Sequence, residues 1–174
     1  MYVFEVRLAD ADRNVYETLT IRAARHPSET AAYLVTRLLA YCLEYTEGIA
    51  MSKGLSDPDV PAIAVRDLTG VLQAWIEIGQ PDAARLHKAA KAAPDVAVYT
   101  HRGLDALLAR FAGERIHRAA ELRLRAFEAE LLDALVARLD RRMSFDLAVS
   151  DRTLYVSLGD ETLTGAIEDR RLDG

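Results

Sequence analysis

Alternation between hydrophobic and polar positions marks both ends of the chain. Residues 2–8 and 15–22 alternate on either side of the turn ADADRN, which predicts an N-terminal β-hairpin over residues 2–22. Near the other end, the stretch MSFDLAVSDRTLYVSLGDETLTGAIED alternates around the turn signals SD and GD. This stretch predicts a small antiparallel β addition at the C-terminus.

A helical period follows the N-terminal hairpin. Pro27 and Ser28 are helix-start signals, Glu29 falls in the first turn, and Gly48 is a plausible stop. Hydrophobic positions recur along one stripe at Ala31, Leu34, Leu38, Cys42 and Tyr45. The stripe predicts a substantially buried helix, in which the cysteine is a small buried residue.

The middle of the chain predicts the order strand, strand, helix, strand. A proline-containing loop over 50–61 precedes a short strand at 62–66, and the turn DLTG leads into a strand at 71–79. A helix then begins at Pro81, and residues 97–100 form the next strand. A strand that arrives through a helical crossover usually lies parallel to its predecessor, so a mixed α/β sheet is expected.

Helical spacing returns in the last third of the chain. The stripe consists of Ile116, Ala120, Leu124, Phe127, Leu131 and Leu135. It predicts one long helix over 113–140, and with the C-terminal strands this helix accounts for the region 113–168. Arginines at 115, 118, 123 and 125 interleave with glutamates, which favours a solvated, ion-paired helix over a phosphate-binding surface.

The composition is that of a globular protein with one domain over residues 1–174. Hydrophobic residues make up 51% of the chain and charged residues 28%. No stretch approaches the roughly 18 apolar residues of a membrane span, and the N-terminus reads as a strand, not a signal peptide. One cysteine excludes an intramolecular disulfide, and a cytoplasmic location is the default expectation. The net charge of -5 argues mildly against a dedicated nucleic-acid-binding surface.

Two carboxylates flank the apolar strand at 71–79. Asp67 precedes the strand, and Glu77 lies near its end, on the same face as Trp75. Glu77 either points to solvent or serves a site that needs a negative charge. A hairpin alone does not bring Asp67 next to Glu77, because one is near the turn and the other is at the far end. If a twist, a bulge or a different pairing made them converge, they could hold a hard divalent cation such as Mg²⁺.

Several uncommon strings in this order carry a resemblance to a known family. The strings RHPSET, SKGLS, RDLTG and WIEIGQPD, the last followed by a lysine-bearing helix, resemble the YaeQ family of bacterial proteins. The resemblance covers nearly the whole chain and is densest over residues 25–100. The family is similar in fold to the PD-(D/E)XK nuclease superfamily, whose core is a helix, a three-stranded meander, a helix and a fourth strand. The resemblance implies an α/β (α+β) protein with a restriction-endonuclease-like core, a mixed sheet flanked by helices.

The resemblance also assigns roles to the acidic residues. Asp67 matches the first acidic position of the superfamily motif, and Glu77 matches the acidic position of the strand motif. Glu29 resembles the additional helical acid that some members contribute to the metal site. The implied cofactor is Mg²⁺ or Mn²⁺, with Glu29, Asp67 and Glu77 as ligands.

The chain departs from the superfamily at the catalytic lysine. The position two residues after Glu77 is Gly79, which cannot orient the attacking water or stabilise a pentavalent phosphate. Gln80 could position a water molecule by hydrogen bonding but cannot supply positive charge. Lys53, in the loop SKGLS, is the first candidate for the missing charge, and Lys88 and Lys91 on the following helix are others.

Two functions follow from these residues. The first is a divalent-metal-dependent phosphodiesterase of nuclease type acting on nucleic acid, with Asp67, Glu77, Gln80 and Lys53 as catalytic residues. The alternative is a catalytically inactive nuclease-like module that binds nucleic acid or a protein partner. The retained carboxylates favour the first function, whereas Gly79 and the acidic net charge favour the second. An acid–base role for Glu77 on a small molecule has little support.

Overall fold

The computed structural model describes residues 1–52 and 59–172 as a mixed α+β fold built on one ten-stranded sheet. The strands are β1 (Tyr2–Asp10), β2 (Val15–Ala23), β3 (Ile49–Met51), β4 (Ile63–Arg66), β5 (Leu72–Ile78), β6 (Asp95–Thr100), β7 (Arg123–Phe127), β8 (Arg142–Ser150), β9 (Thr153–Leu158) and β10 (Glu161–Arg170). The helices are α1 (Ala31–Leu43), α2 (Ala83–Ala92), α3 (Leu104–Phe111) and α4 (Ala129–Ala137), with a short 3₁₀ turn at Ala119–Glu121.

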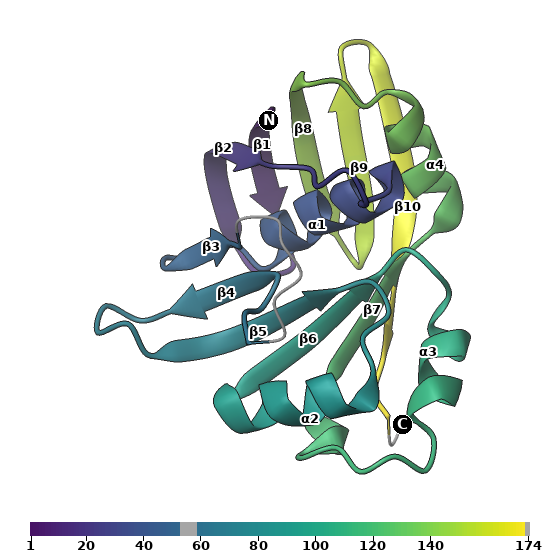
Figure 1. Cartoon of the computed structure of the whole chain (residues 1–174). Helices are drawn as coiled ribbons and strands as arrows, with labels where there is room; N and C mark the ends of the chain where they lie inside the picture. Colours follow the sequence, from purple (N-terminus) through teal and green to yellow (C-terminus); the bar gives the residue numbers. More distant parts are fainter. Residues whose placement is uncertain (53–58, 173–174) are drawn as a thin grey trace.

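The sheet is strongly curved and nearly closes around α1 (Figure 1). Its strand order is β2-β1-β8-β9-β10-β7-β6-β5-β4-β3. β10 joins the two halves, because its first part pairs with β9 and its last part with β7. At the bend, a Cβ on Gly165 would lie 2.6 Å from the Cβ of Leu131, so the glycine lets α4 pack directly against β10.

Two hydrophobic clusters cover the two faces of the β5–β6–β7 region. The larger cluster lies around α1 and α4, inside the curved sheet, and includes Phe4, Leu34, Ile76, Tyr99 and Phe145. The smaller one packs α2 and α3 on the outer face and includes Trp75, Leu86, Val98, Leu107 and Leu124. Successive β5 residues therefore alternate between the clusters, which places Glu77 on the α2 side with Trp75.

The predicted β-hairpins at both ends are confirmed. β1 pairs antiparallel with β2 from Tyr2 opposite Ala23 to Asp10 opposite Val15, and the C-terminal strands β8, β9 and β10 pair antiparallel in sequence order. β1 also pairs in parallel with β8. The two ends of the chain thus form one half of the sheet, where two separate additions had been expected.

The prediction of one long helix over 113–140 is wrong. This segment contains a loop, the 3₁₀ turn, β7 and only then the nine-residue α4. In β7, Leu124 and Ala126 are buried in the outer cluster, whereas Arg123 and Arg125 point to the opposite face. Side chains that alternate between two faces are typical of a strand in a sheet. The pairing of β7 with β6 and β10 outweighs the helical spacing of its hydrophobic residues.

The predicted central elements are present with shifted ends. Thr30 is the N-cap of α1, because its side chain accepts a hydrogen bond from the backbone N–H of Tyr33 at 3.1 Å. Glu29 therefore precedes the helix instead of lying in its first turn. The helix ends at Leu43, before Gly48, and the expected loop over 50–61 contains the end of strand β3.

Candidate active site

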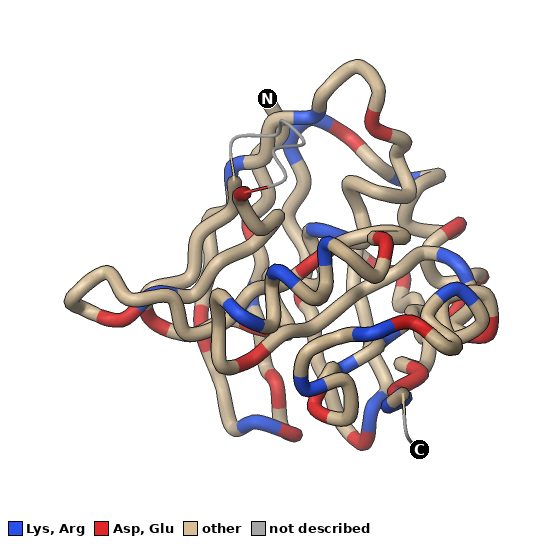
Figure 2. Tube along the Cα trace, turned by 60° about the horizontal axis from the view of Figure 1, so that its bottom comes forward, with Lys and Arg blue, Asp and Glu red and all other residues tan. Residues whose placement is uncertain are grey.

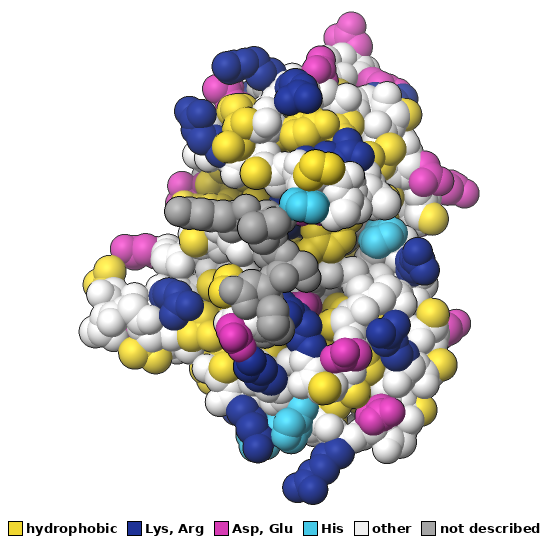
Figure 3. Space-filling view, viewed as in Figure 1, with side chains coloured by type: hydrophobic (Ala, Val, Ile, Leu, Met, Phe, Trp, Pro, Cys, Tyr) yellow, Lys and Arg dark blue, Asp and Glu magenta, His cyan; other side chains and the backbone are white. Residues whose placement is uncertain are grey.

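A cleft lies where the parallel strands of the sheet end. β5 pairs in parallel with β6, and β6 with β7, so their carboxyl ends meet at one edge. Ligands in sheets of this type usually bind at that edge. A cavity of about 790 Å³ opens there, lined by residues around the start of α1, the end of β5, the start of α2 and the end of β6. Histidine and charged side chains surround the middle of this face (Figure 3).

Three of the residues singled out from the sequence line this cavity: Glu29, Glu77 and Gln80. They come from the segment before α1, from β5 and from the turn after β5. Tyr33 lies among the charged groups of the cleft. Burial is the largest influence on Tyr33 and raises its pKa, and the charges of both Glu29 and Glu77 act on it as well. The two glutamates therefore face one region.

Glu77 is buried and fully hydrogen-bonded. Its side chain is only 6% exposed. Oε1 accepts hydrogen bonds from Trp75 Nε1 at 2.6 Å and from Arg85 Nη2 at 2.9 Å, while Oε2 accepts one from Arg85 Nε at 2.7 Å. The hydrogen bonds to Glu77 raise the pKa of Arg85. Arg85 Nη2 also donates to the carbonyl oxygen of Val60 at 2.9 Å. The result is a two-pronged ion pair in the cleft wall.

Glu29 is less well satisfied. Its Oε2 lies 3.4 Å from Nη2 of Arg37, which is 2% exposed. Within the described part of the chain, this oxygen is buried and has no hydrogen-bond partner, and neither does Nε of Arg37. Nη2 of Arg37 donates instead to the carbonyl oxygen of Ala24 at 2.6 Å. Glu29 Oε2 is thus an acceptor that a bound cation or a donor could satisfy.

Two histidines that the sequence did not single out also line the cleft, His26 and His101. Nδ1 of His26 accepts a hydrogen bond from the backbone N–H of Ser28 at 3.1 Å. Nδ1 of His101 is buried without a partner among residues 1–52 and 59–172. Burial lowers the pKa of His101 and so favours the neutral ring. Both rings can offer hydrogen bonds to a ligand.

The prediction that Asp67 shares a metal site with Glu77 is wrong. Asp67 lies in the turn between β4 and β5, where its backbone N–H donates to Val71. From Val71 to Glu77 the chain runs six residues along β5, which at ~3.3 Å per residue is ~20 Å. One Mg²⁺ ion with ligands at ~2.1 Å can bridge oxygens only ~4 Å apart.

Asp67 instead holds the hairpin turn together. Its Oδ1 accepts hydrogen bonds from Thr69 Oγ1 at 2.6 Å, from the Thr69 N–H at 2.9 Å and from the Val71 N–H at 3.0 Å. These hydrogen bonds, the Thr69 hydroxyl first, lower the pKa of Asp67. An aspartate that accepts hydrogen bonds from the two following turn residues is a common turn element. At the other end of the hairpin, the last pair between β4 and β5 is Ile63 with Ile76, so Glu77 lies just beyond the start of β4.

Gly79 occupies the position of the superfamily lysine for a backbone reason. Its φ of +97° is one that residues with a Cβ rarely adopt. A Cβ at this position would also lie 3.4 Å from the ring of Tyr33. The backbone N–H of Gly79 donates to the carbonyl oxygen of Tyr99 at 2.8 Å, which fixes the turn to β6.

Restoring the lysine should therefore destabilise the protein. We expect Gly79→Lys to lower the free energy of unfolding by about 1–2 kcal/mol, the cost of a positive φ for an L-residue. Urea denaturation followed by far-UV circular dichroism measures the change. Gly70→Lys should lose about the same amount, because Gly70 has a φ of +87° with nothing within 4 Å of a Cβ, and it therefore separates the backbone cost from the contact with Tyr33. A Gly79→Lys variant as stable as the wild type would show that the backbone conformation does not explain why Gly79 replaces the superfamily lysine.

None of the predicted lysines that the structure describes supplies positive charge to the cleft. Lys53 lies outside the described residues. Lys88 forms an exposed ion pair with Asp59, and neither Lys88 nor Lys91 lines the cavity. The cations that do are Arg37, Arg85 and Arg102. Arg85 was missed because an arginine on a polar helix reads as solvated. The sequence feature that could have indicated Arg85 as a site residue is its position in the first turn of the helix that directly follows the strand carrying Glu77.

The cleft contains two carboxylates that could serve as metal ligands, Glu29 and Glu77. The described ranges contain no group of three or more histidine, cysteine, aspartate or glutamate side chains arranged to hold a metal ion. Glu29 and Glu77 are two carboxylates on one cavity. This number suits Mg²⁺, which usually binds one or two protein carboxylates and keeps water and substrate oxygens as its other ligands.

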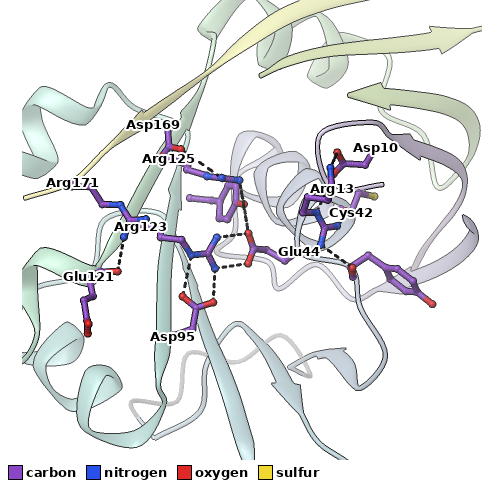
Figure 4. Close-up of polar contacts among 12 residues, drawn as sticks. Asp10, Arg13, Cys42, Glu44, Asp95, Glu121, Arg123, Arg125, Asp169 and Arg171 are labelled. Carbon is purple, nitrogen blue, oxygen red and sulfur yellow. Dashed lines mark hydrogen bonds and ion pairs between the residues drawn. The ribbon is translucent and has the colours of Figure 1, made fainter. Parts of the chain in front are cut away.

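A second charged cluster lies at the C-terminal end of α1 (Figure 4). Glu44 accepts hydrogen bonds from Arg123 at 2.7 and 2.9 Å and from the hydroxyl of Tyr99. Arg123 also binds Asp95, and Arg125 donates to the Tyr99 hydroxyl at 3.0 Å. Both arginines belong to the patch expected to be a solvated helix; instead they are mostly buried. Each carboxylate in this cluster is paired, so the cluster joins α1 to β6 and β7.

Comparison with known proteins gives a consistent result. The family model described as "YaeQ protein" matches residues 1–167. The uncharacterized protein YaeQ of Escherichia coli (strain K12) is 30% identical over 158 residues, which cover 90% of this chain and 87% of that protein. The uncharacterized protein YaeQ of Salmonella typhi is 38% identical over 101 residues, covering 58% of this chain and 56% of the relative.

Two crystal structures share the fold. The YaeQ protein of Xanthomonas axonopodis pv. citri superimposes with a TM-score of 0.89 at 30% identity, over 98% of this chain and 97% of that chain. The YaeQ protein of Pseudomonas syringae gives a TM-score of 0.86 at 31% identity, over 97% and 93% of the two chains. No helix in the described ranges is long and apolar enough to span a membrane. From the family match and these similarities, the chain belongs to the YaeQ family.

Proposed function

We propose that the cleft binds a divalent cation, Mg²⁺ or Mn²⁺, together with a phosphodiester of nucleic acid, and that the protein is a metal-dependent nuclease. The observation that carries the proposal is the convergence of Glu29, Glu77 and Gln80 with the arginines of the cleft. Oε2 of Glu29, buried and without a hydrogen-bond partner among the described residues, is a suitable cation ligand.

The order of elements around the cleft supports the proposed restriction-endonuclease-like core. Helix α1 is followed by the antiparallel strands β3, β4 and β5, by helix α2, and by β6 parallel to β5. The core of the PD-(D/E)XK superfamily has this sequence of helix, meander, helix and strand. The two glutamates then lie at the edge where such enzymes carry their acidic residues.

Each polar group of the cleft has a role in this proposal. Glu29 and Glu77 would hold the cation, which when bound lowers the pKa of a water ligand and neutralises charge on the phosphoryl group. Gln80 donates from Nε2 to Thr100 Oγ1 at 3.4 Å, and its side-chain carbonyl oxygen would orient a water molecule. Arg85 supplies the positive charge that Gly79 cannot, and its planar fork suits phosphate oxygens.

Substitution of Glu29 tests the proposal. Titration calorimetry with Mn²⁺ should show binding to the wild type, and Glu29→Gln should weaken it by about 10–100-fold. Cleavage of single-stranded DNA, duplex DNA and RNA in Mg²⁺ should fall in parallel. Asp67→Asn is the control: it removes a carboxylate outside the cleft and should leave both measurements unchanged. If Glu29→Gln binds Mn²⁺ like the wild type, or the wild type binds no Mn²⁺ either alone or with an oligonucleotide, the proposal is wrong.

The alternative, an inactive module that binds nucleic acid, is favoured by one observation: both oxygens of Glu77 are already occupied by Arg85 and Trp75. The interleaving of basic and acidic residues along the trace (Figure 2) does not distinguish the two functions. For such a module, DNA or RNA should shift in a gel with a salt-dependent affinity. Glu29→Gln and Glu77→Gln should not weaken that shift, and no cleavage should accompany it.

A further inference from the structure

Arg85 and Glu77 together determine when the cleft can accept a cation. Both nitrogens of the Arg85 fork that face Glu77 donate to its carboxylate, at 2.7 and 2.9 Å. Trp75 Nε1 adds a third hydrogen bond at 2.6 Å. A cation that approaches alone meets a carboxylate whose charge is already neutralised and whose inner oxygen is shared by two donors. It must first displace Arg85 from both oxygens of that carboxylate.

A phosphodiester that approaches without a cation meets an arginine whose charge is already neutralised. The Arg85 side chain is 22% exposed, so it can be reached from the cleft, but its charge is neutralised by Glu77. If the phosphate drew Arg85 away, the carboxylate of Glu77, which is 6% exposed in this structure, would lose the guanidinium that neutralises it. Leaving one member of a buried pair without its partner costs several kcal/mol. Neither ligand alone can therefore break the pair cheaply.

The two ligands together remove both difficulties. With a cation on Glu77 and a phosphate on Arg85, each side chain exchanges one partner of opposite charge for another, and no charge is left unpaired. Arg85 lies in the first turn of α2 and lines the same cavity as Glu29, Glu77 and Gln80. Its side chain can therefore exchange Glu77 for a phosphate without leaving the cavity. Its stem also packs over Trp75, with the guanidinium carbon 5.7 Å from the ring centroid.

We propose that the Arg85–Glu77 pair closes the empty site and couples the binding of a divalent cation to that of an anionic phosphodiester. This inference rests on the proposed function and adds its regulation: the cation binds weakly until substrate phosphate takes over Arg85. Coupling between two ligands is reciprocal and typically changes affinities by about 5–150-fold. Water and ions without substrate phosphate are thereby kept from forming an active centre.

Titration with Mn²⁺ alone and with an oligonucleotide tests the coupling. The probe is a phosphorothioate DNA oligonucleotide, which is charged and resists hydrolysis; its control is a methylphosphonate oligonucleotide of the same sequence, which has an uncharged backbone. For the wild type, the phosphorothioate should tighten Mn²⁺ binding at least about tenfold, and the methylphosphonate should not. Trp75, the sole tryptophan in the sequence, donates to Glu77 and gives a fluorescence signal for the same event.

Substitution of Arg85 separates the possibilities. Arg85→Gln should bind Mn²⁺ alone about tenfold more tightly than the wild type, and the oligonucleotide should then have little effect. Arg85→Lys, which keeps the charge but not the fork, should retain only part of the coupling. Lys91→Gln is the matched control: it removes a positive charge from the same helix, outside the cavity, and should leave the coupling intact. Thermal melting with and without Mn²⁺ confirms that each variant folds and reports cation binding independently.

The outcomes are distinct. Tighter Mn²⁺ binding by Arg85→Gln, with loss of coupling, supports the proposal. Equal Mn²⁺ affinity of the wild type with and without the phosphorothioate, or unchanged affinity in Arg85→Gln, overturns it while leaving the nuclease proposal in place. Absence of Mn²⁺ binding by every protein, with or without oligonucleotide, overturns the nuclease proposal and the coupling together.

Discussion

Replacing Glu44 with glutamine should lower the free energy of unfolding by about 3–5 kcal/mol, the usual cost of removing one partner from a buried ion pair. The Glu44 side chain is 9% exposed and accepts hydrogen bonds from Arg123 and Tyr99. A neutral amide has the same shape, but it cannot neutralise Arg123 and it presents its own donors to arginine nitrogens. The loss falls on the contact that ties the end of α1 to β6 and β7.

Urea denaturation measures this loss against a matched control. Glu161 forms a comparable two-pronged pair with Arg138, but at the surface, where the two side chains are 48% and 35% exposed. Exposed pairs contribute at most about 1 kcal/mol, so Glu161→Gln should be nearly as stable as the wild type. A Glu44→Gln variant no less stable than Glu161→Gln would show that the buried cluster does not stabilise the fold.

Acid should remove the same contribution in the wild type. Burial, the largest single influence, would raise the pKa of Glu44, but the hydrogen bonds and charges of Arg123, Tyr99 and Arg125 outweigh it and hold this pKa below its usual range. The folded state therefore binds the proton less tightly than the unfolded chain, where glutamate has a pKa of about 4.3. The stabilisation is complete well above that pH and is lost as the pH falls through the folded-state pKa. The stability difference between the wild type and Glu44→Gln should shrink over this acidic range.

The hairpins and the central crossover could be predicted because their signals are local. Alternation and turn residues gave β1–β2 and the C-terminal strands, and a strand followed by a helix gave β5, α2 and β6. The parallel pairing of β1 with β8 could not be predicted, since it joins residues 139 positions apart in the sequence, such as Val3 and Arg142. Nothing in the alternation of either strand specifies its neighbour.

The long-helix error has a similar origin. In the segment RLRAF, the spacing of Leu124 and Phe127 fits a helix, but the alternation of arginine and hydrophobic residues fits a strand. The structure resolves the conflict in favour of the strand because Arg123 and Arg125 find carboxylates on one face while Leu124 and Ala126 are buried on the other. Those carboxylates come from other elements, so the sequence alone could not decide.

Asp67, one of the two carboxylates expected to hold the metal ion, belongs to the turn between β4 and β5. Asp67 and Glu77 are ten residues apart in a hairpin whose turn lies next to Asp67, and antiparallel geometry then carries Glu77 to the opposite end. Glu77 comes to lie one residue beyond Ile76, which pairs with Ile63 at the start of β4. Glu29 was recognisable only through the family resemblance, and its buried arginine neighbour only through the fold.

Glu77→Gln should have the largest combined effect on stability and cation binding. The substitution leaves Arg85 without its anion and places an amide nitrogen against the donors of Trp75 and Arg85, so we expect a loss of about 3–5 kcal/mol in the free energy of unfolding. Mn²⁺ binding should become undetectable by calorimetry, because a neutral amide is a poor ligand for a hard cation.

The double variant Glu77→Gln/Arg85→Gln distinguishes the ion pair from other effects of the substitution. If the pair is the cause, removing the second charge should recover about 1–3 kcal/mol of the loss, since the guanidinium no longer faces an amide in place of the Glu77 carboxylate. Cation binding should not recover, because the carboxylate is still missing. Recovery of neither stability nor binding would mean that Arg85 does not depend on Glu77, whereas recovery of binding would mean that Glu77 is not a cation ligand.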